Sequence, residues 1–195
     1  MRIIAGQWKG RTLDTPTWDG VRPTSDRLRE TLFNVLAGEV AGARVLDVYA
    51  GTGAVGLEAL SRGAAAVTFV EQDRRAVALV RRNLARCGAS DAYVIVARDA
   101  AEALRSGRFD PFDLVFLDPP YADASRDGVL SLAAAHVAAS GVLVLEHAHR
   151  QPPPDTAGPL SRVRTLRQGD SALSFYRHVP VTADGGAPGS PGGAS

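Results

Sequence analysis

Apolar strand-like runs alternate with helical segments through the middle of the chain, and this order restricts the fold more than any other feature. The strands are apolar almost throughout rather than at every second residue, which is typical of a parallel sheet covered by helices on both faces. Expected strands span residues 44–50, 66–71, 92–97, 113–118 and 142–147, and expected helices span 53–62, 73–87, 100–105 and 129–139. The sequence therefore predicts an α/β, Rossmann-like fold with a mostly parallel sheet.

Both ends of this core carry further elements. Residues 2–14 predict a short β-hairpin around Gly6 and Gly10, and residues 25–38 predict a helix with Thr24 or Ser25 as its N-cap. Residues 161–168 and 171–179 flank Gly169-Asp170 and predict a closing antiparallel hairpin. The expected organisation is an N-terminal extension (1–20), one α/β domain (21–179) and a disordered glycine-rich tail (180–195).

Composition excludes several classes of protein. The 195 residues suit one domain, and 22 basic against 21 acidic residues leave a formal charge of +1, which makes no general demand for nucleic acid. The single cysteine, Cys87, excludes an internal disulfide and a cysteine zinc cluster, while His147 and His149 read as a solvated pair without a third metal ligand. From the cysteine and histidine content we expect no metal site. Since the first residues lack a signal-peptide core and no run approaches the ~20 apolar residues of a membrane span, we expect a cytoplasmic protein.

A glycine-rich turn follows the first strand of the core. The segment from Gly51 to Gly56 fits G-x-G-x-x-G and leads into a helix, so its backbone can approach a ligand and offer free N–H groups, although a tight turn without a ligand would also need glycine. Glu71 lies 20 residues beyond Gly51, at the end of the next strand, where a carboxylate accepts both ribose hydroxyls of an adenosine-containing cofactor. NAD and S-adenosylmethionine both satisfy this pattern.

Asp47 distinguishes between these two cofactors. It lies four residues before Gly51, where its charge would repel a diphosphate and attract the cationic amino acid part of S-adenosylmethionine. Asp99, after the third strand, could accept from the adenine amine, cap the following helix, or do both. Because open α/β sheets bind ligands beyond the carboxyl ends of their strands, these acidic residues and Asp118 should border one crevice. The predicted cofactor contacts are Asp47, Tyr49, Ala50, Gly51, Gly53, Glu71 and Asp99.

The fourth strand ends in the tetrad Asp118-Pro119-Pro120-Tyr121. These residue types also occur in ordinary loops, but two consecutive prolines hold the chain extended and can fix a carboxylate and a carbonyl in place. If Asp118 and the Pro119 carbonyl each accept one hydrogen of an exocyclic amine, its lone pair is held toward an incoming methyl group. Tyr121 would stack on the base, so the tetrad predicts a methyl acceptor site.

Other functions remain open at this level. A dehydrogenase would explain the glycines and Glu71 but would leave the tetrad unused. A methyltransferase acting on DNA amines or on a protein glutamine would use the same kind of tetrad, although 195 residues leave little room for a DNA-recognition region. A nonenzymatic RNA-binding module is the third alternative, and it would tolerate loss of Asp118.

The segments VLDVYAGTGAVGLEALSRGA, FVEQD and LDPPY resemble the class I S-adenosylmethionine-dependent amino methyltransferases, a seven-stranded fold. RIIAGQWKGRTL with VRPTSDRLRETLFNVL is similar to the RsmD family, whose members methylate the N2 amine of one guanine in 16S ribosomal RNA. The resemblance implies a monomer acting on 16S ribosomal RNA or a 30S assembly intermediate, with S-adenosylmethionine as donor and S-adenosylhomocysteine as product. It also implies RNA contacts by Arg2, Trp8, Lys9, Arg11, Arg22, Arg27 and Arg29.

Overall fold

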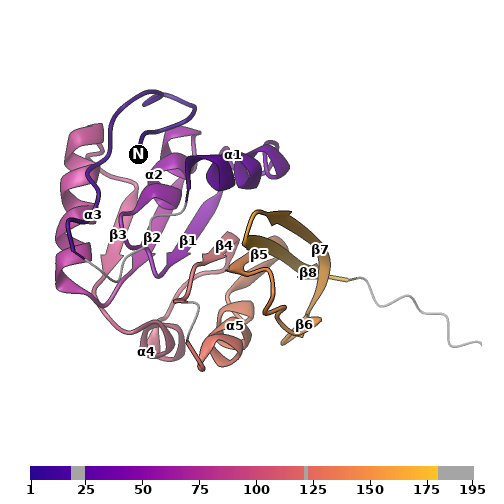
Figure 1. The fold of residues 1–195 in the computed structure, drawn as a ribbon. Helices are drawn as coiled ribbons and strands as arrows, with labels where there is room; N and C mark the ends of the chain where they lie inside the picture. Colours follow the sequence, from indigo (N-terminus) through magenta and orange to yellow (C-terminus); the bar gives the residue numbers. More distant parts are fainter. Residues whose placement is uncertain (19–24, 121–122, 180–195) are drawn as a thin grey trace, which may run out of the picture.

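In the computed structural model of the chain, residues 1–18, 25–120 and 123–179 are described. Their strands form one sheet of order β3-β2-β1-β4-β5-β8-β7-β6, in which the first five are parallel and the last three are added antiparallel (Figure 1). The strands are β1 (Arg44–Val48), β2 (Ala66–Val70), β3 (Tyr93–Val96), β4 (Phe112–Leu117), β5 (Val137–Ala148), β6 (Thr156–Ala157), β7 (Leu160–Gln168) and β8 (Ser171–His178). This arrangement confirms the predicted α/β fold with its closing antiparallel hairpin.

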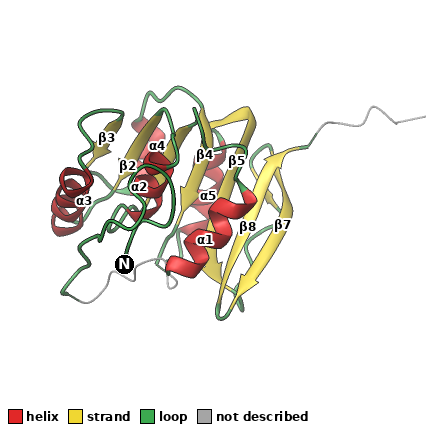
Figure 2. Cartoon of the chain, turned by 90° about the horizontal axis from the view of Figure 1, so that it is seen from above, coloured by secondary structure: helices red, strands yellow, loops and turns green. Residues whose placement is uncertain are grey.

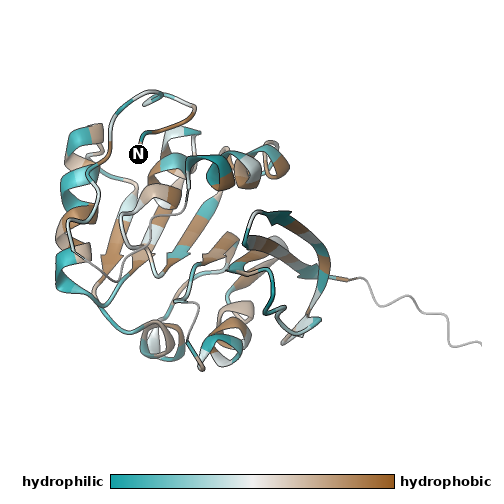
Figure 3. Cartoon of the chain, viewed as in Figure 1, coloured by the Kyte–Doolittle hydropathy of each residue, from teal (hydrophilic) through white to brown (hydrophobic). Residues whose placement is uncertain are grey.

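Helices cover both faces of the sheet, as the apolar strands require. The helices are α1 (Asp26–Val35), α2 (Ala54–Ser61), α3 (Arg74–Cys87), α4 (Ala100–Ser106) and α5 (Arg126–Ala134). One apolar cluster joins α1, α2 and α3 to one face, and a second joins α4 and α5 to the other (Figures 1 and 2). Alternate residues of β1 enter the two clusters, with Val45 in the first and Leu46 in the second. The central strands are accordingly brown in Figure 3, while the helices show teal outer faces.

Strand order places a switch point at β1. The chain moves from β1 to β2 and β3 on one side and then returns to β4 on the other side, so loops leaving β1 and β4 diverge at the carboxyl edge. Ligands of open α/β sheets bind in the crevice formed at such a point. The glycine loop after β1 and the Asp118 segment after β4 both lie there.

Two local expectations were wrong, and a third was met in a shorter form. The sheet has eight strands rather than seven, because Thr156–Ala157, in the segment read as a linker, pairs with β7. The helix expected at 129–139 ends at Ala134, and Val137 already belongs to β5 because it pairs with Phe112 of β4, overriding the helix propensity of the alanines. The hairpin expected at 2–14 is confirmed, since its arms pair antiparallel through a bridge between Arg2 and Thr12 and a hydrogen bond of 2.9 Å from the Ile3 N–H to the Arg11 carbonyl, although the pairing is too short to form named strands.

The N-terminal segment nevertheless packs firmly on the sheet domain. Ile3 and Leu13 are buried in the same cluster as α1, α2 and α3. The N-cap expected at the start of α1 is confirmed, since the Ser25 hydroxyl accepts from the Leu28 N–H at 3.1 Å. Within the described residues, no helix is long and apolar enough to cross a membrane. The predicted tail, 180–195, lies outside the described residues.

Candidate functional site

The glycine loop joins β1 to α2 and has an unusual backbone. Tyr49, Gly51 and Gly53 have φ angles of 61°, 55° and 75°, all in the left-handed region. Glycine adopts this region freely, but for Tyr49 it is strained, and such strain concentrates at functional sites. The turn is closed by a hydrogen bond of 2.7 Å from the Gly53 N–H to the Ala50 carbonyl. The third glycine of the motif, Gly56, allows close packing, because a Cβ there would lie 2.3 Å from the Phe69 ring.

Glu71 fixes this loop from the end of β2. One carboxylate oxygen accepts from the Gly51 N–H at 2.9 Å, and the other accepts from the Asp73 N–H at 2.8 Å. A carboxylate oxygen can accept more than one hydrogen bond, so both oxygens can also receive hydroxyl groups. The arrangement suits the ribose diol that the sequence assigns to Glu71.

Asp47 lies beneath the loop, with only 2% of its surface exposed. Its Oδ2 accepts from the Gly56 N–H at 2.9 Å. Burial raises the pKa of this carboxyl to about 8, against the opposing effect of the Gly56 hydrogen bond and with further increases from the charges of Asp118 and Glu71. Three of the four acidic strand ends therefore lie close enough to influence one another, as the crevice prediction required.

Asp99, the fourth acidic strand end, caps α4. Its side chain accepts from the Glu102 N–H at 3.0 Å, so the helix-cap alternative is confirmed, while the adenine contact stays a prediction. Burial raises the pKa of Tyr49, and the charges of Asp123 and Asp99 add to this effect. Asp99 therefore faces the same edge of the sheet as the loop that begins at Tyr49.

The segment after β4 is held against β1. The Asp118 N–H donates to the Val48 carbonyl over 3.4 Å, and Asp118 is half-buried beside a buried Pro119. The carbonyl of Pro120 accepts from the Asp123 N–H at 2.9 Å, which fixes the far side of the proline pair. Tyr121, the predicted stacking residue, lies outside the described residues.

Asp123 is a site residue that the sequence reasoning missed. Its Oδ2 accepts from the Tyr49 hydroxyl at 3.2 Å and thereby links the acidic-proline segment to the residue before the glycine loop. Hydrogen bonds from Ser125, opposed by partial burial, lower the pKa of Asp123 and keep it ionised. Its only sequence signal was its place two residues after the tetrad.

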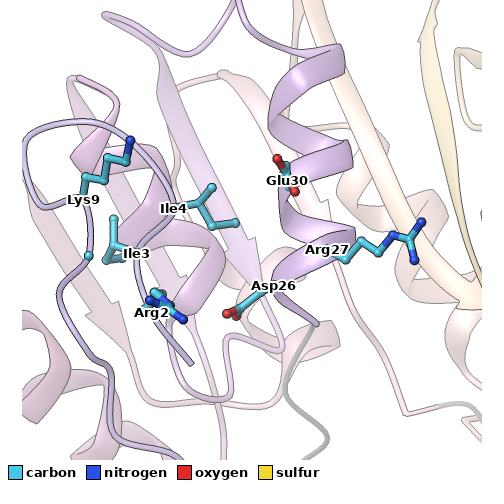
Figure 4. Close-up of a pocket in the computed structure, with 8 residues that line it drawn as sticks. Arg2, Ile3, Ile4, Lys9, Asp26, Arg27 and Glu30 are labelled. Carbon is cyan, nitrogen blue, oxygen red and sulfur yellow. The ribbon is translucent and has the colours of Figure 1, made fainter.

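The predicted RNA contacts divide into two groups. Exposed Arg2, Lys9 and Arg27 line an open groove of about 580 Å³ between the N-terminal loop and α1 (Figure 4). Arg29 also belongs to α1, but it is completely buried, and the expectation that it contacts RNA was wrong. Its Nη2 donates to the Arg2 carbonyl at 2.9 Å and to Asp26 at 2.5 Å, so its buried side chain connects the N-terminal loop to α1 beneath the groove.

The remaining RNA candidates have structural partners or lack description. Arg11 is exposed, yet its Nη1 donates to the carbonyls of Arg86 and Cys87 at the end of α3. Trp8 is half-buried against the core, and its backbone N–H donates to the Ser61 hydroxyl at 3.0 Å. Arg22 lies outside the described residues. RNA contact by these three residues stays a prediction.

The two histidines do not form a solvated pair. His147 is 3% exposed, and its Nε2 lies 2.9 Å from the Ser174 hydroxyl, so it belongs to the sheet interior. Burial lowers the pKa of His147 and keeps it neutral. In the part of the chain that the structure describes, no group of three or more His, Cys, Asp or Glu side chains could hold a metal ion.

Glu58 of α2 is a further residue that the sequence reasoning did not single out. It is fully buried, and its two oxygens accept from the N–H groups of Ile4 and Ala5 at 2.8 and 3.0 Å. Because α2 begins at the glycine loop, one helix connects the candidate cofactor site to the N-terminal segment. Nothing in the local pattern distinguished Glu58 from a solvated helix residue.

These residues fit an adenosyl donor with a cationic amino acid group. Glu71 offers a carboxylate for a ribose diol, and Gly51 and Gly53 allow close backbone approach. Asp47 lies beneath the loop, where the charge of a nearby ammonium would lower its pKa and favour the ionised carboxylate. Asp118 lies at the same edge of the sheet, where its carboxylate can accept a hydrogen bond from an amine that receives a methyl group.

A family model described as Conserved hypothetical protein 95 matches residues 1–177. Ribosomal RNA small subunit methyltransferase D of Escherichia coli strain K12 is 47% identical over 121 residues, 62% of this chain and 60% of that protein. YlbH of Bacillus subtilis is 34% identical over 181 residues, 91% of this chain and 98% of the relative. The solved structure of yhhF from Escherichia coli is 37% identical with a TM-score of 0.80, covering 91% of this chain and 97% of that one. The chain thus spans about 60% of the length of the Escherichia coli methyltransferase in that alignment.

Proposed function

Because the chain belongs to the family described as Conserved hypothetical protein 95, we propose that it is an S-adenosylmethionine-dependent ribosomal RNA methyltransferase. The acceptor is the exocyclic N2 amine of one guanine in 16S ribosomal RNA. The observation that carries this proposal is that Asp47 lies in β1 while Glu71 and Asp118 directly follow β2 and β4, the two strands that pair with β1 in parallel, so that all three carboxyl groups lie at one edge of the sheet. A donor site and an acceptor carboxylate are thereby adjacent.

The donor is held by residues of three strand ends. Glu71 accepts hydrogen bonds from the ribose hydroxyls, and Asp99 lies beside the adenine. Asp47 is protonated in the protein without donor, and the ammonium of the amino acid part lowers its pKa on binding, so that the two groups pair as ions. Backbone groups of Tyr49, Ala50, Gly51 and Gly53 shape the surface against which the donor lies. The bound donor supplies a methyl sulfonium, an electrophile that needs no further activation.

The acceptor amine is positioned by the acidic-proline segment. An N2 amine is a weak nucleophile because its lone pair is delocalised into the ring. Asp118 and the Pro119 carbonyl each accept one of its hydrogens, which directs the lone pair toward the methyl group. As the N–C bond forms and the C–S bond breaks, the nitrogen becomes cationic, and Asp118 or water takes its proton. Pro120 keeps the segment stiff, and Tyr121 stacks on the base, worth roughly 1–3 kcal/mol.

RNA reaches this edge along the N-terminal segment and α1. Arg2, Lys9 and Arg27 contact phosphates at the groove of Figure 4. Arg22, outside the described residues, is proposed as a further RNA contact. Trp8 contributes its half-exposed ring, and Arg11 adds charge beside α3. Since the target guanine is part of a folded RNA, it is turned out of its stack to meet Asp118. We propose that the protein acts as a monomer in the cytoplasm, on 16S ribosomal RNA or a 30S assembly intermediate.

Incubation with labelled S-adenosylmethionine tests the function. The substrates are deproteinised 16S ribosomal RNA, partly assembled small-subunit particles and finished subunits, each digested to nucleosides afterwards. We expect labelled N2-methylguanosine in at least one of the three. Its absence from all of them, in a preparation that binds S-adenosylhomocysteine, would overturn the assigned substrate.

A further inference from the structure

The chain from Arg11 to Trp18, the α3 strap, runs antiparallel along α3 (Figure 1). Arg11 donates to the carbonyls of Arg86 and Cys87 at the end of the helix. Asp14 then pairs with Arg86 at 3.0 Å, and the Trp18 ring lies 5.0 Å from the guanidinium of Arg75 in the first turn. The strap therefore leads from the N-terminal loop to the edge where the donor is proposed to bind.

Asn83 of α3 joins this strap to the glycine loop. It is completely buried. Its amide nitrogen donates to the Thr52 carbonyl at 2.9 Å and to the Asp14 carbonyl at 3.1 Å, while its oxygen accepts from the Asp14 N–H at 2.8 Å. Both N–H hydrogens and the acceptor of one planar amide are thus used on backbone groups. A displacement of Thr52 changes the geometry of all three bonds.

A second connection leads to the other side of the donor site. The Arg75 guanidinium, which faces the Trp18 ring, also binds the Asp73 carboxylate, with a distance of 2.9 Å from Nη2 to Asp73 Oδ2. The Asp73 N–H in turn donates to Glu71, the proposed ribose carboxylate. The Trp18 indole N–H is buried and has no hydrogen-bond partner among the described residues.

We propose that Asn83 is a positioning residue that couples donor binding at the glycine loop to RNA binding by the N-terminal segment. Resting on the proposed function, this inference adds a link between its two sites. Donor binding restricts the motion of the loop at Gly51 and Gly53. Because Asn83 is hydrogen-bonded to both Thr52 and Asp14, the α3 strap is restricted as well. The strap in turn restricts the basic N-terminal segment that precedes it in the chain. Each ligand should therefore raise the affinity for the other, because the ordering cost is met once.

Equilibrium dialysis with labelled S-adenosylhomocysteine, with and without saturating deproteinised 16S ribosomal RNA, measures this coupling. We expect the wild-type protein to bind S-adenosylhomocysteine at least about fivefold tighter with RNA present. Asn83→Asp keeps an acceptor for the Asp14 N–H and removes both donors, so the ratio should fall to about twofold or less, below the usual range of such couplings. Leu84→Val, a neighbouring buried change on α3 away from the strap contacts, should keep the wild-type ratio.

Hydrogen exchange on the wild-type protein provides a second measurement that does not depend on folding of a variant. S-adenosylhomocysteine alone should slow exchange of the amides of residues 11–18, including that of Asp14. If exchange at residues 11–18 is unchanged, or if Asn83→Asp keeps the wild-type ratio of S-adenosylhomocysteine affinities with and without RNA, the coupling is overturned. The proposed function would survive either result, provided that the wild-type protein methylates ribosomal RNA. A wild-type protein that neither binds S-adenosylhomocysteine nor methylates ribosomal RNA would instead remove the proposed function and this inference together.

Discussion

Arg29 of α1 and Glu58 of α2 face each other in the interior, both completely buried, with Nη1 and Oε2 3.6 Å apart. Each of them also binds backbone of the N-terminal segment, Arg29 at the Arg2 carbonyl and Glu58 at the N–H groups of Ile4 and Ala5. The basic loop is therefore attached to the sheet domain through a buried ion pair. The proposed RNA-binding surface therefore depends on charges that are buried away from solvent.

Substitutions in α1 can distinguish the structural arginine of this pair from an arginine proposed to bind RNA. Arg29→Met leaves Glu58 without one cationic partner, and we expect the free energy of unfolding to fall by about 3–5 kcal/mol, the usual effect of breaking a buried pair. Arg27→Ala, on the exposed side of the same helix, should leave stability within about 0.5 kcal/mol and weaken RNA binding. Urea denaturation and a filter-binding titration decide both. Equal loss of stability in the two variants would contradict the assignment.

The two glycines of the N-terminal loop provide a matched test of how it is attached. Both have left-handed φ angles, 82° at Gly6 and 84° at Gly10, but a Cβ at Gly6 would lie 1.8 Å from the Ser61 carbonyl oxygen, whereas one at Gly10 meets no atom within 4 Å. Gly10→Ala should cost only the backbone strain, about 1–2 kcal/mol. Gly6→Ala must in addition displace the loop from α2.

Thermal unfolding and RNA affinity should therefore both fall further for Gly6→Ala than for Gly10→Ala. Similar values for the two variants would show that the close approach to Ser61 is not what holds the loop.

Asp118 should act on the chemical step. We expect Asp118→Ala to lower the single-turnover rate of methyl transfer on the order of 10²-fold, because the amine loses one of the groups that orient it. Asp110→Ala offers a matched control, since the Asp110 side chain is 86% exposed in the loop before β4. Rapid-quench measurement with both variants at saturating donor separates the two. Full activity of Asp118→Ala would favour a nonenzymatic role for the tetrad.

The raised pKa of Asp47 predicts a characteristic dependence of stability on pH. The folded protein holds this proton up to about pH 8, whereas the ordinary pKa is 3.8, so between these values the native state binds more protons than the unfolded chain. The stabilising contribution is complete at low pH and is lost as pH rises through this window. Compared with Asp47→Asn, wild-type stability should decline by up to about 1.4 kcal/mol per pH unit.

Urea denaturation at pH values from 5 to 8 measures this difference. The control is Asp110→Asn, whose exposed site should give a curve parallel to the wild type. Parallel curves for wild type and Asp47→Asn would show that Asp47 is ionised throughout.

Prediction succeeded where a pattern extends along the chain. The apolar runs at 44–50 and 113–118 became β1 and β4 because a strand buried on both faces needs apolar residues at nearly every position. Prediction failed at the end of α5, where pairing of Val137 with Phe112 overrode local helix propensity. It also failed at Arg29, because an arginine that ends in the interior has the same sequence signature as one that faces solvent.

The sequence by itself determined the alternation of the central strands and helices, the glycine loop and the set of acidic strand ends. These features depend on local spacing and on the rule that parallel strands end at one edge. Only the tertiary structure decided that Asn83 bonds Thr52 and Asp14, that Tyr49 bonds Asp123, and that Glu58 holds the N-terminal loop. Such contacts join residues far apart in the chain, and their partners follow from packing of the helices on the sheet rather than from any pattern within one segment.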